Sequence, residues 1–94
     1  MYAGNTEPMG HAAEALLLAR DLDGADRQLD EAFHLAQRIG EIQEVPRFLL
    51  LRGKIAAARG DRAAARGFFE QALQESRAHK APYFEQKALA ALAG

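Results

Sequence analysis

Apolar residues recur at steps of three and four positions through most of this 94-residue chain, which is the spacing of one face of an α-helix. The clearest stripe consists of Leu29, Ala32, Phe33, Ala36 and Ile39. No segment shows the alternating pattern that is typical of a strand. The pattern therefore predicts five helices, over about 7–20, 25–39, 45–59, 62–79 and 82–93.

The residues at the predicted helix ends agree with these boundaries. Thr6 and Asp61 stand where an N-cap is expected, because their side-chain oxygens can accept a backbone N–H of the first turn. Pro46 and Pro82 fall in first turns, where a missing N–H does no harm. Gly40 is placed to end the second helix in the left-handed conformation. The connections are short, so successive helices should lie antiparallel.

Much of the chain repeats itself after a shift of about 40 residues, since 13–40 aligns with 53–80. The shift pairs Asp21 with Asp61, Ala25 with Ala65, Leu29 with Phe69 and Ala32 with Ala72. A repeat of this length indicates helical hairpins that stack and cover one another's apolar faces. We expect one domain over 1–94, with a first repeat at about 7–40, a second at about 45–80 and a half repeat or capping helix at about 82–93.

Small residues in the second repeat predict close helix packing. Gly53 lies inside a helix, where glycine costs roughly 1 kcal/mol relative to alanine, so the fold should need a close approach there. Ala65 and Ala72 allow the fourth helix to come close to its neighbours, and Phe69 between them is expected to fill the core.

Composition excludes several function classes. The chain has 12 basic and 13 acidic residues, far from the basic excess that binds phosphates, so we expect no nucleic-acid partner. Without cysteine, thiolate metal sites and disulfides are absent. No apolar run approaches the length of a membrane span and the first ten residues do not resemble a signal peptide, so we expect no membrane partner and a cytoplasmic location.

In the second repeat the chain resembles the tetratricopeptide repeat (TPR) family. That family places a glycine in the first helix, a Gly-Asp turn, and then alanine, a large aromatic and Ala-Leu in the second helix. The matching residues here are Gly53, Gly60-Asp61, Ala65, Phe69 and Ala72-Leu73. The repeat of about 40 residues is longer than the usual length of about 34 and is similar to arrays in bacterial signalling ATPases, cyclase-associated proteins and transcription regulators.

The resemblance implies an all-α fold of antiparallel helix-turn-helix repeats in a short right-handed superhelix of five helices. It also implies a non-catalytic scaffold that binds a protein or peptide in a groove. Carried over by position, the groove residues are Arg47, Leu50, Lys54 and Lys87, with Ala57 and Glu14 beside them. They would favour an acidic or carboxylate-bearing segment, and the alternative is a solvated helix face. A carboxylate clamp would also need groove asparagines, and Asn5 is the only asparagine.

Catalytic and metal-binding patterns are weak. Glu31 and His34 have the spacing of a helical ligand pair, but a di-iron bundle needs two such pairs. No phosphate-binding loop or nucleophile motif is present, and Ser76 is interpreted as a packing residue. We expect no enzyme activity, no cofactor and no metal. The alternative to a scaffold is a regulatory sensor segment for a small molecule or signal peptide.

The last predicted helix has more apolar surface than one neighbour should cover. Phe84, Ala88, Leu89 and Leu92 spread over a broad arc of this helix. A terminal repeat normally has a polar outer face. We therefore expect either a homodimer through this helix or further repeats in a longer chain.

Overall fold

The computed structural model describes residues 6–94, and this part of the chain is all-helical, without strands. Its five helices are α1 (Glu7–Leu18), α2 (Leu22–Ile39), α3 (Val45–Ala58), α4 (Arg62–Ala78) and α5 (Pro82–Ala93). They form a flattened body of 42 × 30 × 16 Å. The predicted all-α class with five helices is confirmed for residues 6–94.

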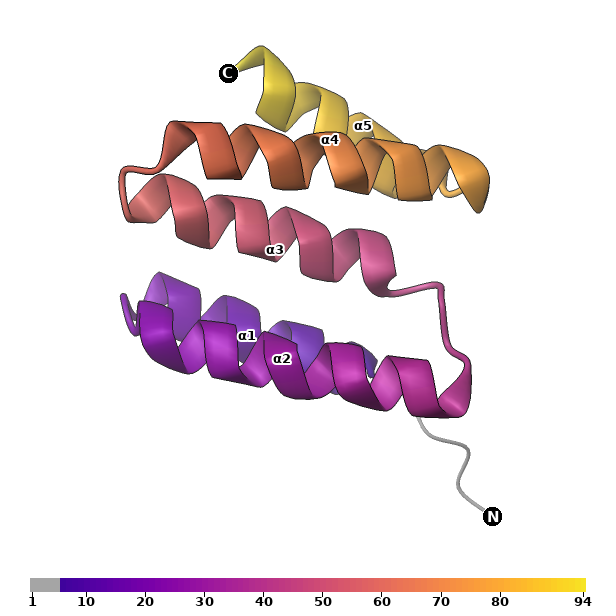
Figure 1. Cartoon of the computed structure of the whole chain (residues 1–94), viewed down its shortest axis with the longest axis horizontal. Coiled ribbons are helices and arrows are strands. Elements are labelled where there is room, and N and C mark those ends of the chain that lie inside the picture. Colours follow the sequence, from indigo (N-terminus) through magenta and orange to yellow (C-terminus); the bar gives the residue numbers. More distant parts are fainter. Residues whose placement is uncertain (1–5) are drawn as a thin grey trace.

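The helices run back and forth, and α3 occupies the centre. Figure 1 shows α2, α3 and α4 as three stacked rows, with α1 behind α2 and α5 behind α4. The central helix α3 contacts every other helix, whereas α5 contacts only α4 and α3. Because α1 and α5 both contact α3, these three helices form one face of the molecule, on the side that faces away in this view.

Each of the four helix connections contains one residue in the left-handed conformation. These residues are Arg20, Gly40, Gly60 and Lys80, with φ of 67°, 71°, 85° and 53°, so they recur every 20 positions. After each of them, the next backbone N–H donates to the carbonyl five residues earlier, as from Asp61 to Ala56 at 2.9 Å. This is the Schellman arrangement, which satisfies carbonyls at a helix end. Glycine adopts it without strain at two turns, whereas Arg20 and Lys80 adopt it at a steric cost.

Aspartate side chains cap the second helix of each hairpin. Asp21 accepts a hydrogen bond from the Gly24 N–H at 3.0 Å, and Asp61 accepts one from the Ala64 N–H at 3.1 Å. The predicted N-cap at Asp61 is therefore confirmed. The prediction that the second helix begins at about residue 25 was wrong, because the Asp21 cap starts the helix at Leu22. The repeat aligns Asp21 with Asp61, the predicted N-cap, and this alignment already indicated that Asp21 caps the second helix.

Thr6 stands at the N-cap position of α1, but its side chain makes no capping hydrogen bond. It is fully buried, and both its N–H and its hydroxyl donate to the carboxylate of Glu41, the N–H at 2.8 Å. The start of α1 is thus fastened to the connection between α2 and α3. A local cap has been replaced by a contact between segments 35 residues apart.

The core has two centres. Leu29, Phe48 and Ile55 lie fully buried where α1 and α2 meet α3. Phe69 is buried in the second centre, where α3, α4 and α5 meet. A Cβ atom added to Gly53 would lie 2.4 Å from Cε1 of Phe69, so this glycine makes room for the ring. The close helix approach expected at Gly53 is present.

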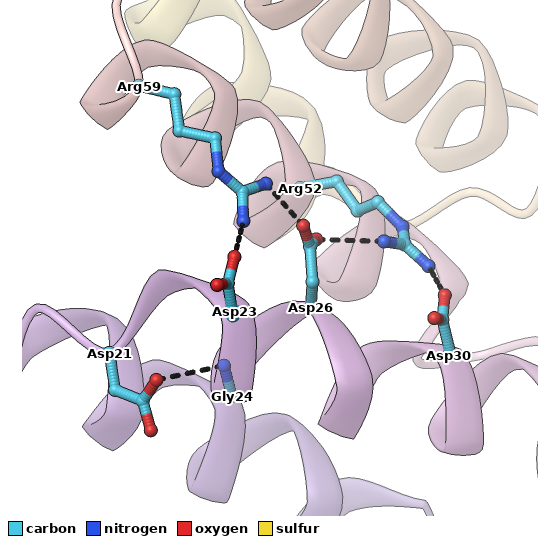
Figure 2. Close-up of polar contacts among 7 residues, drawn as sticks. All are labelled: Asp21, Asp23, Gly24, Asp26, Asp30, Arg52 and Arg59. Carbon is cyan, nitrogen blue, oxygen red and sulfur yellow. Dashed lines mark hydrogen bonds and ion pairs between the residues drawn. The ribbon is translucent and has the colours of Figure 1, made fainter.

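Ion pairs join the two hairpins along the α2–α3 junction. Arg52 contacts Asp26 at 2.9 Å and also pairs with Asp30, and Arg59 pairs with Asp26 and Asp23 (Figure 2). The hydrogen bonds to Asp26 and Asp23 raise the pKa of Arg59 above its ordinary value. Asp26 lies between the two arginines, so it links the pairs into one network (Figure 2).

Candidate functional site

A pocket of about 120 Å³ opens between the first, third and fifth helices. We call it the α3–α5 pocket. It is lined by Glu14 from α1, by Arg47, Leu50, Leu51 and Lys54 from α3, and by Tyr83, Phe84, Lys87 and Ala91 from α5. The structure thus brings Arg47, Leu50, Lys54, Lys87 and Glu14 together, whereas Ala57 is exposed and lies outside the lining. That these residues bind a partner stays a prediction.

Five of the nine lining residues, Leu50, Leu51, Tyr83, Phe84 and Ala91, give the pocket an apolar part. Leu50 is a buried lining residue, and the rings of Tyr83 and Phe84 meet edge to face with centroids 5.2 Å apart. Tyr83 keeps 61% of its surface exposed. Sequence reasoning missed both aromatic residues as lining, although their place directly after Pro82 puts them in the first turn of α5. An apolar side chain of a partner would find matching surface here.

Arg47, a lining residue, is held in place by contacts with its neighbours. Its Nε donates to Glu44 at 2.8 Å, and its guanidinium carbon lies 5.1 Å from the centre of the Phe84 ring. Its stem passes close to α1, where a Cβ on Gly10 would lie 2.9 Å from Cδ of Arg47. The charge of Arg47 is therefore already paired, and its side chain connects α1, α3 and α5.

The two lysines present their charges differently. Lys54 and Lys87 are both exposed at the mouth of the pocket. Nζ of Lys87 lies 5.3 Å from the centre of the Tyr83 ring, and within residues 6–94 neither ammonium group has an ion-pair partner. Glu14, which lines the pocket from α1, is half-buried. The site can offer two cations and one anion around an apolar centre.

The four residues of the expected self-association face on α5 differ in how much of their surface is exposed. Ala88 is fully buried against the second core centre, so it offers no surface to a partner. Phe84 and Leu92 are partly buried against the same centre, and Leu89 remains 44% exposed. Self-association through α5 stays a prediction, and light scattering at micromolar concentration checks it.

The weak catalytic candidates do not converge. Glu31 and His34 both lie on the exposed face of α2. Ser76 is buried, and its hydroxyl donates to the carbonyl of Leu73 at 2.9 Å. Within residues 6–94, no group of three or more histidine, aspartate or glutamate side chains is arranged to hold a metal ion. Asn5 lies outside the described residues.

None of the described helices combines the length and the apolar character that crossing a membrane requires. Comparison of the sequence with models of protein families, with curated proteins and with solved structures finds no match. The functional argument therefore rests on the residues and their arrangement.

Proposed function

We propose that this chain is a non-catalytic protein-interaction module, a TPR-like scaffold that binds a segment of another protein in the α3–α5 pocket. The observation that carries the proposal is the convergence of three helices on one surface that combines apolar walls with unpaired cations. Interfaces commonly combine buried aromatic anchors with a polar rim. The pattern of small and aromatic residues around Gly53 and Phe69 supports the TPR-like arrangement of the hairpins.

The size of the pocket favours a peptide over a small-molecule ligand. Sites that enclose small molecules typically measure about 300–1,000 Å³. A pocket of about 120 Å³ holds one side chain of a larger ligand instead. The α3–α5 pocket does not offer a small-molecule sensor an enclosed space of that size, so the scaffold is the function that we carry forward for this pocket.

Selection from a phage-displayed library of random dodecapeptides tests this function. We expect the chain to enrich peptides, and the strongest of them to shift NMR amide signals of α3 and α5 around the pocket. Tyr83→Ala should weaken that peptide about fivefold or more, because an exposed aromatic wall is lost without opening the core. Leu18→Ala removes another exposed apolar side chain, 78% exposed and outside the pocket, and should have no effect.

Two outcomes would refute this proposal of a scaffold that binds through the α3–α5 pocket. One is the absence of any peptide enriched over wells without protein. The other is a set of amide shifts confined to the exposed face of α2, because binding there would not involve the pocket.

A further inference from the structure

We infer that the α3–α5 pocket selects a segment in which an apolar side chain stands beside a carboxylate, and that Lys54 and Lys87 bind this carboxylate while Arg47 positions the wall. The inference rests on the proposed function and adds the chemistry of the partner. It assigns different roles to three cations that sequence position alone treats alike.

The first step concerns which charges are available. Arg47 is held by Glu44 at 2.8 Å and lies over the ring of Phe84. A ligand carboxylate would have to displace Glu44 in order to pair with it. Lys54 and Lys87 have no such competitor among residues 6–94, and they stand on two different helices at the mouth of one pocket. Two lysines that line one pocket from two helices suit one anionic group bound in that pocket.

The second step concerns what must accompany the carboxylate. A single exposed ion pair contributes little affinity, so charge alone would not hold a segment. Leu50, Phe84 and Ala91 provide apolar surface in the same pocket as the lysines. The pocket volume of about 120 Å³ accommodates one aliphatic side chain next to the charged one. The recognised feature is thus a neighbouring pair, one apolar residue and one acidic residue.

The third step concerns Glu14, which lines the pocket from α1. Its carboxylate would repel a second acidic group that extended toward α1, and the chain as a whole has a net charge of -1. The site therefore favours a carboxylate on the α3–α5 side and disfavours a uniformly acidic tract. This repulsive element narrows the class of partners.

The fourth step concerns Arg47 as a positioning residue. Its guanidinium covers Phe84, and its stem fits against Gly10 of α1, so it holds α5 and α1 at fixed places around α3. Replacement by methionine keeps an unbranched stem and removes the charge. Arg47→Met should therefore weaken acidic and neutral peptides by the same factor, whereas loss of either lysine should weaken acidic peptides alone.

Parallel library selections on three proteins test the inference. The wild-type chain should enrich dodecapeptides in which Asp or Glu adjoins an aliphatic residue. The double variant Lys54→Glu with Lys87→Glu should enrich Lys or Arg at the same place. The control Arg62→Glu with Lys80→Glu changes the net charge equally at exposed sites outside the pocket, and it should select the wild-type class.

Calorimetry on the strongest wild-type peptide and its Glu→Gln form provides the magnitudes. Neutralising both lysines with glutamine should weaken the acidic peptide roughly tenfold, since each exposed pair changes affinity by up to about fivefold. The Gln form should be insensitive to these substitutions, and about 0.5 M NaCl should remove the difference between the two peptides.

The outcomes separate the inference from the function on which it rests. If wild-type peptides map to the pocket but show no acidic preference, the carboxylate assignment is overturned and the scaffold function stands. If the acidic preference persists in the double glutamate variant, the lysines are not its source and the inference is also overturned. If no peptide is enriched by any of the proteins, both fall together.

Discussion

Replacing Gly53 by alanine tests the closest contact in the core. The added Cβ would lie 2.4, 2.6 and 2.9 Å from three atoms of the Phe69 ring, whereas ordinary carbon contacts are about 3.5–4.0 Å. The ring would have to move by about 1 Å, although it is buried between α3 and α4. Such overpacking costs about 1–3 kcal/mol, and the better helix propensity of alanine returns about 1 kcal/mol. We expect a net loss of about 0–2 kcal/mol.

Gly67 in α4 provides a matched control for the same substitution. A Cβ added there meets nothing within 4 Å. Gly67→Ala should therefore keep only the propensity gain and stabilise the chain by about 0.5–1 kcal/mol. The difference between the two variants cancels this gain and isolates the steric term at Gly53, about 1–3 kcal/mol.

Urea unfolding followed by far-UV circular dichroism measures both variants. We expect the urea midpoint to fall or stay unchanged for Gly53→Ala and to rise for Gly67→Ala. Thermal unfolding should give the same order, with the two Tm values differing by about 4–8 °C per kcal/mol. Combining Gly53→Ala with Phe69→Leu should cost less than the sum of the single changes, because the smaller side chain relieves the contact. Equal stabilisation by the two alanine substitutions would refute the close approach of α3 to Phe69.

The polar features of the fold give further predictions. Arg20→Gly and Lys80→Gly should each raise the free energy of unfolding by up to about 1 kcal/mol, because glycine adopts positive φ without strain; unchanged urea midpoints would contradict that reasoning. Asp61→Ala should cost about 0.5–2 kcal/mol through loss of the cap on α4, and Asp61→Asn should recover most of it in the same assay. Asp26→Asn should lower thermal stability at low salt, and the loss should shrink in 1 M NaCl; a loss independent of salt would mean that the network acts through packing alone.

The fold was largely predictable because the sequence carries its information locally. Apolar residues at helical spacing, first-turn prolines, glycines at helix ends and one aspartate cap marked most helix ends to within two residues. The start of α2 was missed because Leu22 and Gly24 lack a helical appearance in isolation. Only the contact between the Asp21 side chain and the Gly24 N–H places them in the first turn.

Contacts between distant residues account for what could not be predicted. Nothing near Thr6 indicates that its hydroxyl binds Glu41, since a threonine before a helix usually caps that helix. Likewise, position in the repeat brought Arg47 and Lys54 to one face but could not tell which charge was already paired. That distinction depends on Glu44, Phe84 and the space beside Gly10, which only the packed structure brings together.

The left-handed turns at positions 20, 40, 60 and 80 are equally spaced along the chain. Each interval between successive turns holds one helix and the same number of residues, so a hairpin of two intervals can be duplicated or deleted at these points without changing the phase of the helices on either side. Each turn closes by hydrogen bonds within its own neighbourhood, so a new copy would need no partner elsewhere in the chain to form its ends. The turns are therefore the points at which recombination or protein design can add or remove whole hairpins and so change the length of the array.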